Sequence, residues 1–135
     1  MSAASSLQKA IFTKLSGDAG LTALVGADGI TDRRPDGPAA PLVVIAGIDS
    51  FDHSTASETG EEHGVTLEAW SEAKGHREVQ AIAAAVRAAL DDAALALAGH
   101  HLVFLFHRET RLRRDGKSRF HRAEMRFRAV TEPDV

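Results

Sequence analysis

The sequence has no cysteine, and this absence removes several classes of function at once. Without thiols the chain can hold no disulfide, no cysteine-ligated zinc and no thiol nucleophile. Long apolar runs are absent too, because uncharged apolar stretches such as residues 81–86 are far shorter than the about 20 apolar residues that a membrane-spanning helix needs. Lys9 and Lys14 interrupt the first apolar positions, so we expect no signal peptide. These absences predict a soluble, cytoplasmic protein without a membrane partner.

Motifs for catalysis and metal binding are also missing. No serine stands in a nucleophile-elbow pattern, and the glycine-containing segment 16–20 lacks the lysine and the preceding strand of a phosphate-binding loop. Among the 7 histidines, only His53 and His63 could approach each other, and no third ligand stands at useful spacing. We therefore expect no enzyme, no metal and no cofactor. A metal-dependent hydrolase that relies on His53 and His63 is the remaining catalytic alternative.

Acidic and basic side chains are unevenly distributed along the chain. Residues 1–70 carry 4 Lys/Arg and 10 Asp/Glu, whereas residues 100–135 carry 9 and 5, so the first block has a formal charge of −6 and the last of +4. Such asymmetry can indicate a nucleic-acid-binding face. It can equally indicate subunits that meet acidic side to basic side, because complementary potentials set the register between partners. The asymmetry is mild, which favours the second interpretation.

The chain is long enough for one domain and shows no internal boundary. Its 135 residues are 44% hydrophobic, which is sufficient for a single core. No repeat and no linker divides it. We predict one domain over residues 1–135.

The change of hydrophobic period between residues 65 and 90 is the clearest structural signal. Val65, Leu67 and Ala69 alternate with polar or aromatic neighbours, as in a half-buried strand. After a short break at 71–75, apolar residues return at helical spacing over 79–90. Trp70 projects opposite Leu67 and Ala69, so it either packs under this helix, which we favour, or lies at a subunit interface.

The N-terminal half predicts a helix, a second short turn and a strand. Ser5 or Ser6 could cap a first helix whose apolar face holds Leu7, Ile11 and Leu15, ending near Ser16 and a left-handed Gly17. A second short turn follows over 19–24. The aliphatic residues 42–45 begin a strand that we expect to reach about residue 51. Residues 52–62 are polar, acidic and without period, and therefore predict an exposed loop, either simply solvated or ordered by a partner.

The C-terminal part predicts a long β-hairpin after a tight turn at Gly99-His100. Asp115-Gly116 is a strong two-residue turn signal and pairs Arg114 with Lys117. Counting outward from this turn pairs Phe106 with Met125, Phe104 with Phe127 and Leu102 with Ala129 on an apolar face. On the opposite face it pairs Glu109 with Arg122 and His107 with Glu124. The tip of the hairpin, residues 111–119, is strongly basic, and it is either a solvated turn, a protein interface or, third, a DNA-binding element.

Seven segments follow one another in a characteristic order: Leu7–Ile11 with Leu15, Leu21–Gly26, Pro41–Ile45, Val65–Ser71, Val79–Leu90, Gly99–Val103 and Phe127–Glu132. This order resembles the tail-completion, or tail-terminator, proteins of long-tailed phages and phage-like gene transfer agents. The resemblance covers nearly the whole chain, and the Ala/Arg-rich composition is closer to the gene-transfer-agent branch.

The resemblance implies a structural protein with an α+β fold. We accordingly expect a mainly antiparallel β-sheet with two helices packed on one face and a long C-terminal β-hairpin. Proteins of this family form a ring, usually a hexamer, that caps the tail tube and joins it to the head-side connector. The implied partners are other copies of the chain, the major tail tube protein and the connector or stopper protein. DNA would pass through the lumen without specific binding, and the protein would move from the bacterial cytoplasm into the neck of the particle.

The family has no catalytic residues to transfer, so the candidate sites are interfaces. The acidic loop and the basic hairpin tip are the regions we expect to contact neighbouring subunits or stacked rings. The candidate interface residues are Glu58, Glu61, Glu62, Arg111, Arg113, Arg114, Lys117 and Arg119. The competing hypothesis is a small nucleic-acid-binding or regulatory protein that uses the basic hairpin.

Overall fold

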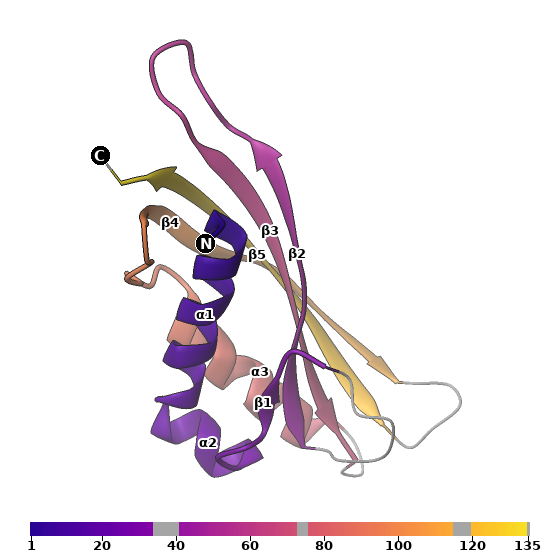
Figure 1. The fold of residues 1–135 in the computed structure, drawn as a ribbon. Coiled ribbons are helices and arrows are strands. Elements are labelled where there is room, and N and C mark those ends of the chain that lie inside the picture. The colour runs from indigo at the N-terminus through magenta and orange to yellow at the C-terminus, as the bar shows by residue number, and fades with distance from the viewer. Residues whose placement is uncertain (34–40, 73–75, 115–119, 135) are drawn as a thin grey trace.

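Three helices cover one face of a five-stranded sheet in the computed structural model (Figure 1), which describes residues 1–33, 41–72, 76–114 and 120–134. The sheet order is β1-β2-β3-β5-β4; β1 pairs with β2 in parallel and the other pairs are antiparallel. This confirms the expected α+β class. In chain order the elements are α1 (Ala3–Ser16), α2 (Ala19–Val25), β1 (Ile30–Thr31), β2 (Leu42–Asp52), β3 (Glu61–Ser71), α3 (Arg77–Leu90), β4 (His100–Arg114) and β5 (His121–Pro133). The described residues hold three helices rather than the two expected, because the segment after Asp18 forms a helix of its own.

Helix α1 begins earlier than the sequence suggested. Ser2 is its N-cap, and the Ser2 hydroxyl accepts a hydrogen bond from the backbone N–H of Ser5 at 3.1 Å. Ser6 is instead buried and donates its hydroxyl to the carbonyl of Ala98 at 2.8 Å. The expected apolar face is confirmed, since the fully buried side chains of this helix are Leu7, Ile11 and Leu15.

The turn between α1 and α2 differs from the expectation in its backbone conformation. Gly17 caps α1 with a φ of −89°, so it is right-handed and not left-handed as predicted. Asp18 begins α2 by accepting the backbone N–H of Leu21 at 2.9 Å. Gly26 ends α2 with a φ of 84°, a conformation that glycine adopts without steric cost. In the described part of the chain, no helix is long and apolar enough to cross a membrane.

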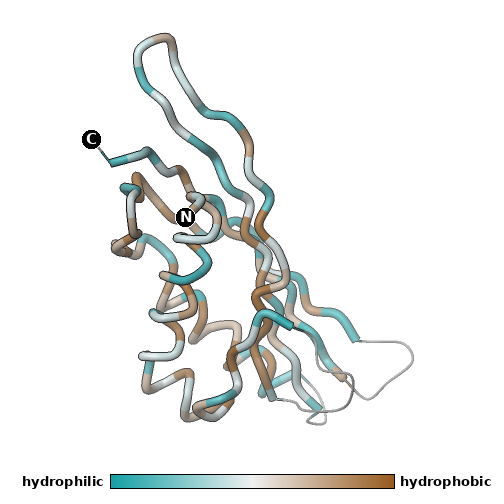
Figure 2. Tube along the Cα trace, in the orientation of Figure 1, coloured by the Kyte–Doolittle hydropathy of each residue, from teal (hydrophilic) through white to brown (hydrophobic). Residues whose placement is uncertain are grey.

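The hydrophobic core lies between the helices and the sheet face that they cover. Figure 2 shows hydrophobic segments concentrated where these two layers meet. The alternation predicted for β3 is confirmed, because Val65, Leu67 and Ala69 are at most 1% exposed. Helix α3 contributes the residues expected from its 3.6 periodicity, namely Val79, Ile82, Ala83, Val86, Ala89 and Leu90. The other face of the sheet is not covered by the helices, and we call it the open face.

The two-residue strand β1 was not expected from the sequence. It pairs with β2 through Ile30 opposite Val43 and Thr31 opposite Val44. A segment this short shows no recognisable period, so only the tertiary structure identifies it.

Strand β5 lies between β3 and β4 and runs antiparallel to both, so β3 and β4 are parallel to each other. The chain leaves the sheet at the end of β3, forms α3 and returns as β4 on the far side of β5.

The predicted register of the C-terminal hairpin is wrong. Arg114 pairs with His121 rather than with Lys117. The predicted turn itself, at 115–116, lies outside the described residues. The observed register replaces every pair that we had counted: Leu102 lies opposite Thr131, Phe104 opposite Val130, Phe106 opposite Arg128, His107 opposite Phe127 and Glu109 opposite Arg126.

Two β-bulges in β4 explain which of its side chains reach the core. They lie between Leu102 and Phe104 and between His107 and Glu109. Each bulge inserts one unpaired residue and so exchanges the faces of the side chains beyond it. Leu105 is therefore fully buried opposite Ala129. Phe104 and Phe106 stack on each other on the open face, with ring centroids 5.1 Å apart.

Trp70 does not pack under α3. It shares the open face with Glu68, whereas Leu67 and Ala69 face the helices. The Trp70 ring meets the edge of Phe120 at a centroid distance of 5.7 Å, and the Arg122 guanidinium lies 5.5 Å from its centroid. The packing interpretation favoured above is thus wrong.

Gly29 provides a test of how tightly α2 and β1 are joined. A Cβ atom at Gly29 would collide with the backbone carbonyl of Val25, whereas one at Gly47 would meet nothing within 4 Å. We expect Gly29→Ala to lower the free energy of unfolding by about 1–3 kcal/mol, as overpacking usually does. Gly47→Ala should change it by less than about 0.5 kcal/mol. Urea unfolding of both variants measures the difference, and equal effects would contradict this tight packing.

Candidate functional site

The acidic and basic candidate residues lie at opposite ends of the sheet. Glu58 lies in the connection between β2 and β3, and Glu61 and Glu62 begin β3. Arg111, Arg113 and Arg114 end β4. Because Glu61 pairs with Thr131 while Arg114 pairs with His121, the two sets are separated by nearly the full length of β5 (Figure 1). We call them the acidic end (Asp52 to Glu62) and the basic end (Arg111 to Arg114); Lys117 and Arg119 lie outside the described residues.

The acidic end is a hydrogen-bonded hairpin rather than a loop over the whole of 52–62. Strands β2 and β3 extend to Asp52 and from Glu61, and the backbone N–H of His53 donates to the carbonyl of Gly60 at 2.9 Å. At the tip, the N–H of Thr55 donates to the carbonyl of Glu58 at 2.7 Å. Hydrogen bonds from the side chain and backbone of Ser54 lower the pKa of Asp52. This carboxylate therefore keeps its negative charge to lower pH than usual.

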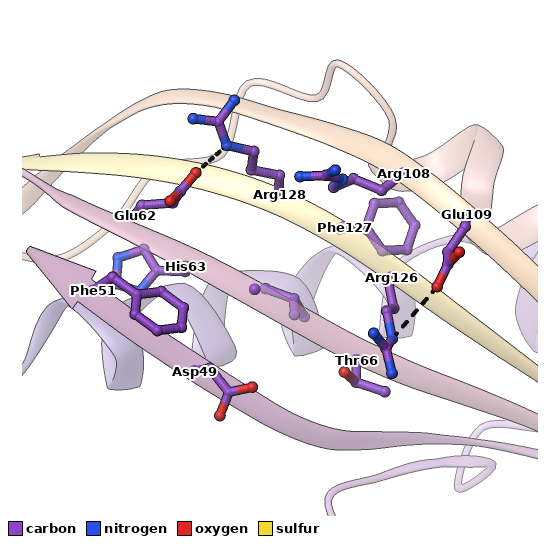
Figure 3. Close-up of a pocket in the computed structure, with 12 residues that line it drawn as sticks. Asp49, Phe51, Glu62, His63, Thr66, Arg108, Glu109, Arg126, Phe127 and Arg128 are labelled. Atoms are coloured by element: carbon purple, nitrogen blue, oxygen red, sulfur yellow. Dashed lines mark hydrogen bonds and ion pairs between the residues drawn. The ribbon is translucent and has the colours of Figure 1, made fainter. Parts of the chain in front are cut away.

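The open face between the two ends carries ion pairs that cross neighbouring strands (Figure 3). Arg128 on β5 pairs with Glu62 on β3. Arg126 on β5 lies 3.7 Å from Glu109 on β4 and 3.4 Å from Glu124 on its own strand. These arginines are partly exposed, so each pair contributes less than about 1 kcal/mol.

A shallow hollow of about 450 Å³ lies on this face, toward the acidic end. Its charged lining comes from all four long strands, with three carboxylates and three guanidiniums: Asp49, Glu62, Glu109, Arg108, Arg126 and Arg128. Equal numbers of opposite charges leave no net field to hold an ionic ligand. Sequence reasoning did not single out Asp49, Arg108, Arg126 or Arg128. Charged and apolar residues alternate along 122–129, and this pattern could have indicated that Arg126 and Arg128 lie on the same face of a strand.

The two histidines of the metal hypothesis are not arranged as ligands. His63 is fully buried on the helix-covered face of the sheet. Its Nδ1 lies 2.7 Å from the Ser50 hydroxyl and its Nε2 lies 2.8 Å from the Thr131 hydroxyl. Both ring nitrogens are thus occupied. His53 lies in the exposed connection after β2. Among the residues that the structure describes, no group of three potential ligands could hold a metal ion.

Burial makes His63 a source of pH-dependent stability. Removal from water lowers the pKa of His63, and the same cause lowers the pKa of His107. Since an unfolded histidine has a pKa of about 6.5, the unfolded chain binds more protons below that pH. We therefore expect the free energy of unfolding to fall as the pH drops below about 6.5, by at most about 1.4 kcal/mol per pH unit for each group.

Denaturant unfolding between pH 7.5 and 5.5 measures this slope. His63→Gln retains groups that can hydrogen bond to both hydroxyls but cannot be protonated there, so its slope should be smaller, with the remainder coming from His107. A slope that His63→Gln leaves unchanged would assign the effect to another group.

Comparisons with known proteins identify the family. The family model described as "Tail completion protein gp17" matches residues 9–132. Among solved structures, one chain of a structure described as "Virion of native gene transfer agent (GTA) particle" is similar to this chain with a TM-score of 0.88 and 34% sequence identity. The match covers 98% of this chain and 99% of the other. No curated protein sequence matches. The chain therefore belongs to the tail completion protein gp17 family and has a structural role in a phage-type tail.

Proposed function

We propose that this protein is a tail terminator: copies of the chain form a closed ring, a hexamer, that caps the tail tube and joins it to the head-side connector. The observation that carries the proposal is the end-to-end likeness, at 34% identity, to a chain of a gene transfer agent virion. At this coverage the whole domain, including both charged ends, has a counterpart in that chain. The protein is made in the bacterial cytoplasm and ends in the neck of a particle.

The separation of charge along the sheet supports a protein that contacts different partners at its two ends. The acidic end projects beyond the helices on the β2–β3 hairpin, and the basic end lies at the far tip of β4 (Figure 1). Complementary charges on two surfaces set the orientation in which neighbouring copies meet. The assembled ring would present one side to the major tail tube protein and the other to the head-side connector or stopper.

The pairing of arginines on the open face supports a ring through which DNA passes without being bound specifically. Protein binds DNA phosphates through cations that replace condensed counterions. Arg122, Arg126 and Arg128 already have carboxylate partners in the chain. Their capacity to bind phosphate is correspondingly reduced. The protein acts by assembly, and no step of its function needs a cofactor or catalysis.

Electron microscopy of purified particles tests this proposal directly. We expect ring-shaped density at the head–tail junction into which the fold fits, and separate heads and tails when the gene is deleted. Particles that lack the protein, or joined particles in the deletion strain, would overturn the proposal.

Arg113 and Arg114 favour one alternative function, because the structure gives neither a carboxylate partner within the described residues. If the protein bound nucleic acid through them, DNA affinity would fall steeply with salt, and charge reversal at Arg113, Arg114 and Lys117 would abolish it. Under the terminator proposal we expect weak DNA binding, and the reversal should impair assembly of the ring because it changes candidate interface residues.

A further inference from the structure

The sheet has two uncovered stretches of edge strand, one at each charged end. On the β2 side, β1 pairs only with Val43 and Val44, so within the described residues 46–52 have no strand beside them. On the β4 side, the turn after α3 covers the middle of the strand: the N–H of His107 donates to Asp91 at 2.9 Å, and the N–H of Asp92 donates to the carbonyl of Leu105 at 2.8 Å. Residues 109–114 extend past this cover.

Unpaired edges present backbone donors and acceptors that can bind another strand. We propose that residues 46–52 of β2 in one copy pair with residues 109–114 of β4 in the next copy, so that the sheet continues from subunit to subunit. This inference rests on the proposed ring, and it names the surface through which the ring closes.

The charges of the two edge stretches are complementary. The β2 stretch carries Asp49 and Asp52, and the β4 stretch carries Arg111, Arg113 and Arg114 together with Glu109, which pairs with Arg111 and Arg126 of its own chain. The Asp49 and Arg113 side chains have no ion pair within the described residues. Within one chain they cannot meet, because they lie on edge strands separated by β3 and β5 and at opposite ends of the sheet. A second copy brings them together.

The faces of the two stretches also match. Asp49 pairs with Gly64 and Phe51 with Glu62, which places both on the open face. Arg111 pairs with Glu124 and Arg113 with Arg122 on that same face. A continuous sheet keeps its faces in register, so the carboxylate of Asp49 and the ring of Phe51, which is 59% exposed, would lie beside the arginines.

The geometry allows this contact to close a ring. Strands β2 and β4 run in opposite directions within the sheet, so a copy in the same orientation pairs them antiparallel. The copy must also be displaced along the strands, because Asp49 lies level with Phe106 and not with Arg113. Such a stagger suits a closed ring whose strands are tilted from its axis. The contact joins two different surfaces of the chain. Such heterologous contacts generate rings when the rotation closes.

A charge swap tests the inference. We expect Asp49→Lys and Arg113→Glu, each alone, to weaken association between copies by roughly tenfold or more, because each places like charges together. The double variant should restore assembly, because the charges are exchanged across every contact. Asp28→Lys, a charge reversal before β1, is the matched control and should leave assembly unchanged. Size-exclusion chromatography with light scattering measures assembly, and circular dichroism checks folding.

Cross-linking provides a second measurement that also works within purified particles. Because the chain has no cysteine, Ser50→Cys combined with Leu112→Cys introduces the only thiols, at exposed positions of the two stretches that leave Asp49, Phe51 and Arg113 in place. A short bifunctional maleimide should then produce a ladder of covalent oligomers, whereas Phe12→Cys with Leu24→Cys, at exposed helix positions, should not. Rings or necks that contain the protein but show neither the charge-swap rescue nor the ladder would overturn this inference and leave the proposed function standing. Absence of the protein from rings and necks alike would overturn both.

Discussion

Replacing Phe127 by alanine is expected to lower the free energy of unfolding by about 3–5 kcal/mol, the largest effect of any substitution considered for this protein. Phe127 is 1% exposed and lies at the centre of the sheet, opposite Val65 on one side and His107 on the other. The edge of the His107 ring packs against it with centroids 5.4 Å apart. Removing the ring leaves a cavity between sheet and helices that the surrounding strands cannot fill. Chemical denaturation with extrapolation to zero denaturant measures the loss.

The matched control is Phe51→Ala, the same substitution at a side chain that is 59% exposed. We expect it to change the free energy of unfolding by less than about 0.5 kcal/mol. If edge pairing between copies is correct, Phe51→Ala reduces assembly while leaving folding intact. A Phe127→Ala variant as stable as Phe51→Ala would contradict the assignment of Phe127 to the core.

Replacing Arg122 by methionine is expected to cost about 3 kcal/mol of stability. Arg122 lies 3.3 Å from Glu68, whose side chain is only 2% exposed although it belongs to the open face. Breaking a buried ion pair costs about 3–5 kcal/mol because the remaining charge has been removed from water. The lower value applies, since Arg122 is 24% exposed and the indole N–H of Trp70 also lies within 3.3 Å of Glu68. Methionine has an unbranched apolar side chain that can still pack over Trp70, as the arginine stem does. The substitution therefore measures mainly the loss of the positive charge.

Arg126→Met is the control for this substitution, on the same strand and the same face. Arg126 is 58% exposed, and its partners Glu109 and Glu124 lie near solvent. We therefore expect a loss below about 1 kcal/mol. Combining Arg122→Met with Glu68→Gln completes a double-mutant cycle that measures the coupling free energy directly. Equal losses for the two arginine variants would show that Glu68 is solvated rather than buried.

The parts of the structure that the sequence predicted are those governed by local periodicity. The 2-residue period placed Val65, Leu67 and Ala69 toward the core, and the 3.6-residue period selected the buried face of α3. Both follow from the geometry of a single element. The apolar face of α1 was recognised for the same reason, although its N-cap was misplaced because Ser2, Ser5 and Ser6 offered equivalent signals.

The hairpin shows where local reasoning stops. Alternation along β4 alone would place Phe104 and Phe106 in the core, but the bulge between Leu102 and Phe104 places Leu105 there instead. A bulge depends on how two strands fit each other, so neither strand's own sequence reveals it. Trp70 was misassigned for a related reason, because which face the helices cover is a property of the whole sheet.

For the candidate interface, the sequence identified the charged residues but not their arrangement. Glu58, Glu61 and Glu62 and the arginines of β4 were recognised from composition. Asp49 was not recognised, because it is an isolated acidic residue in the mainly apolar strand β2. The uncovered edge stretches could not be found at all, because they depend on where β1 ends beside β2 and on the contacts of Asp91 and Asp92 with β4.

The sequence by itself determined that this protein has no thiol chemistry, that it has an α+β fold with a buried strand followed by an Ala-rich helix, and that it resembles the tail completion family. Composition and short-range period suffice for these conclusions, because they depend on residues close together in the chain. Only the tertiary structure decided the register of β4 and β5, the separation of the acidic and basic ends, and the edges left free for another copy. These features depend on residues far apart in sequence, whose relative positions are fixed when the sheet forms.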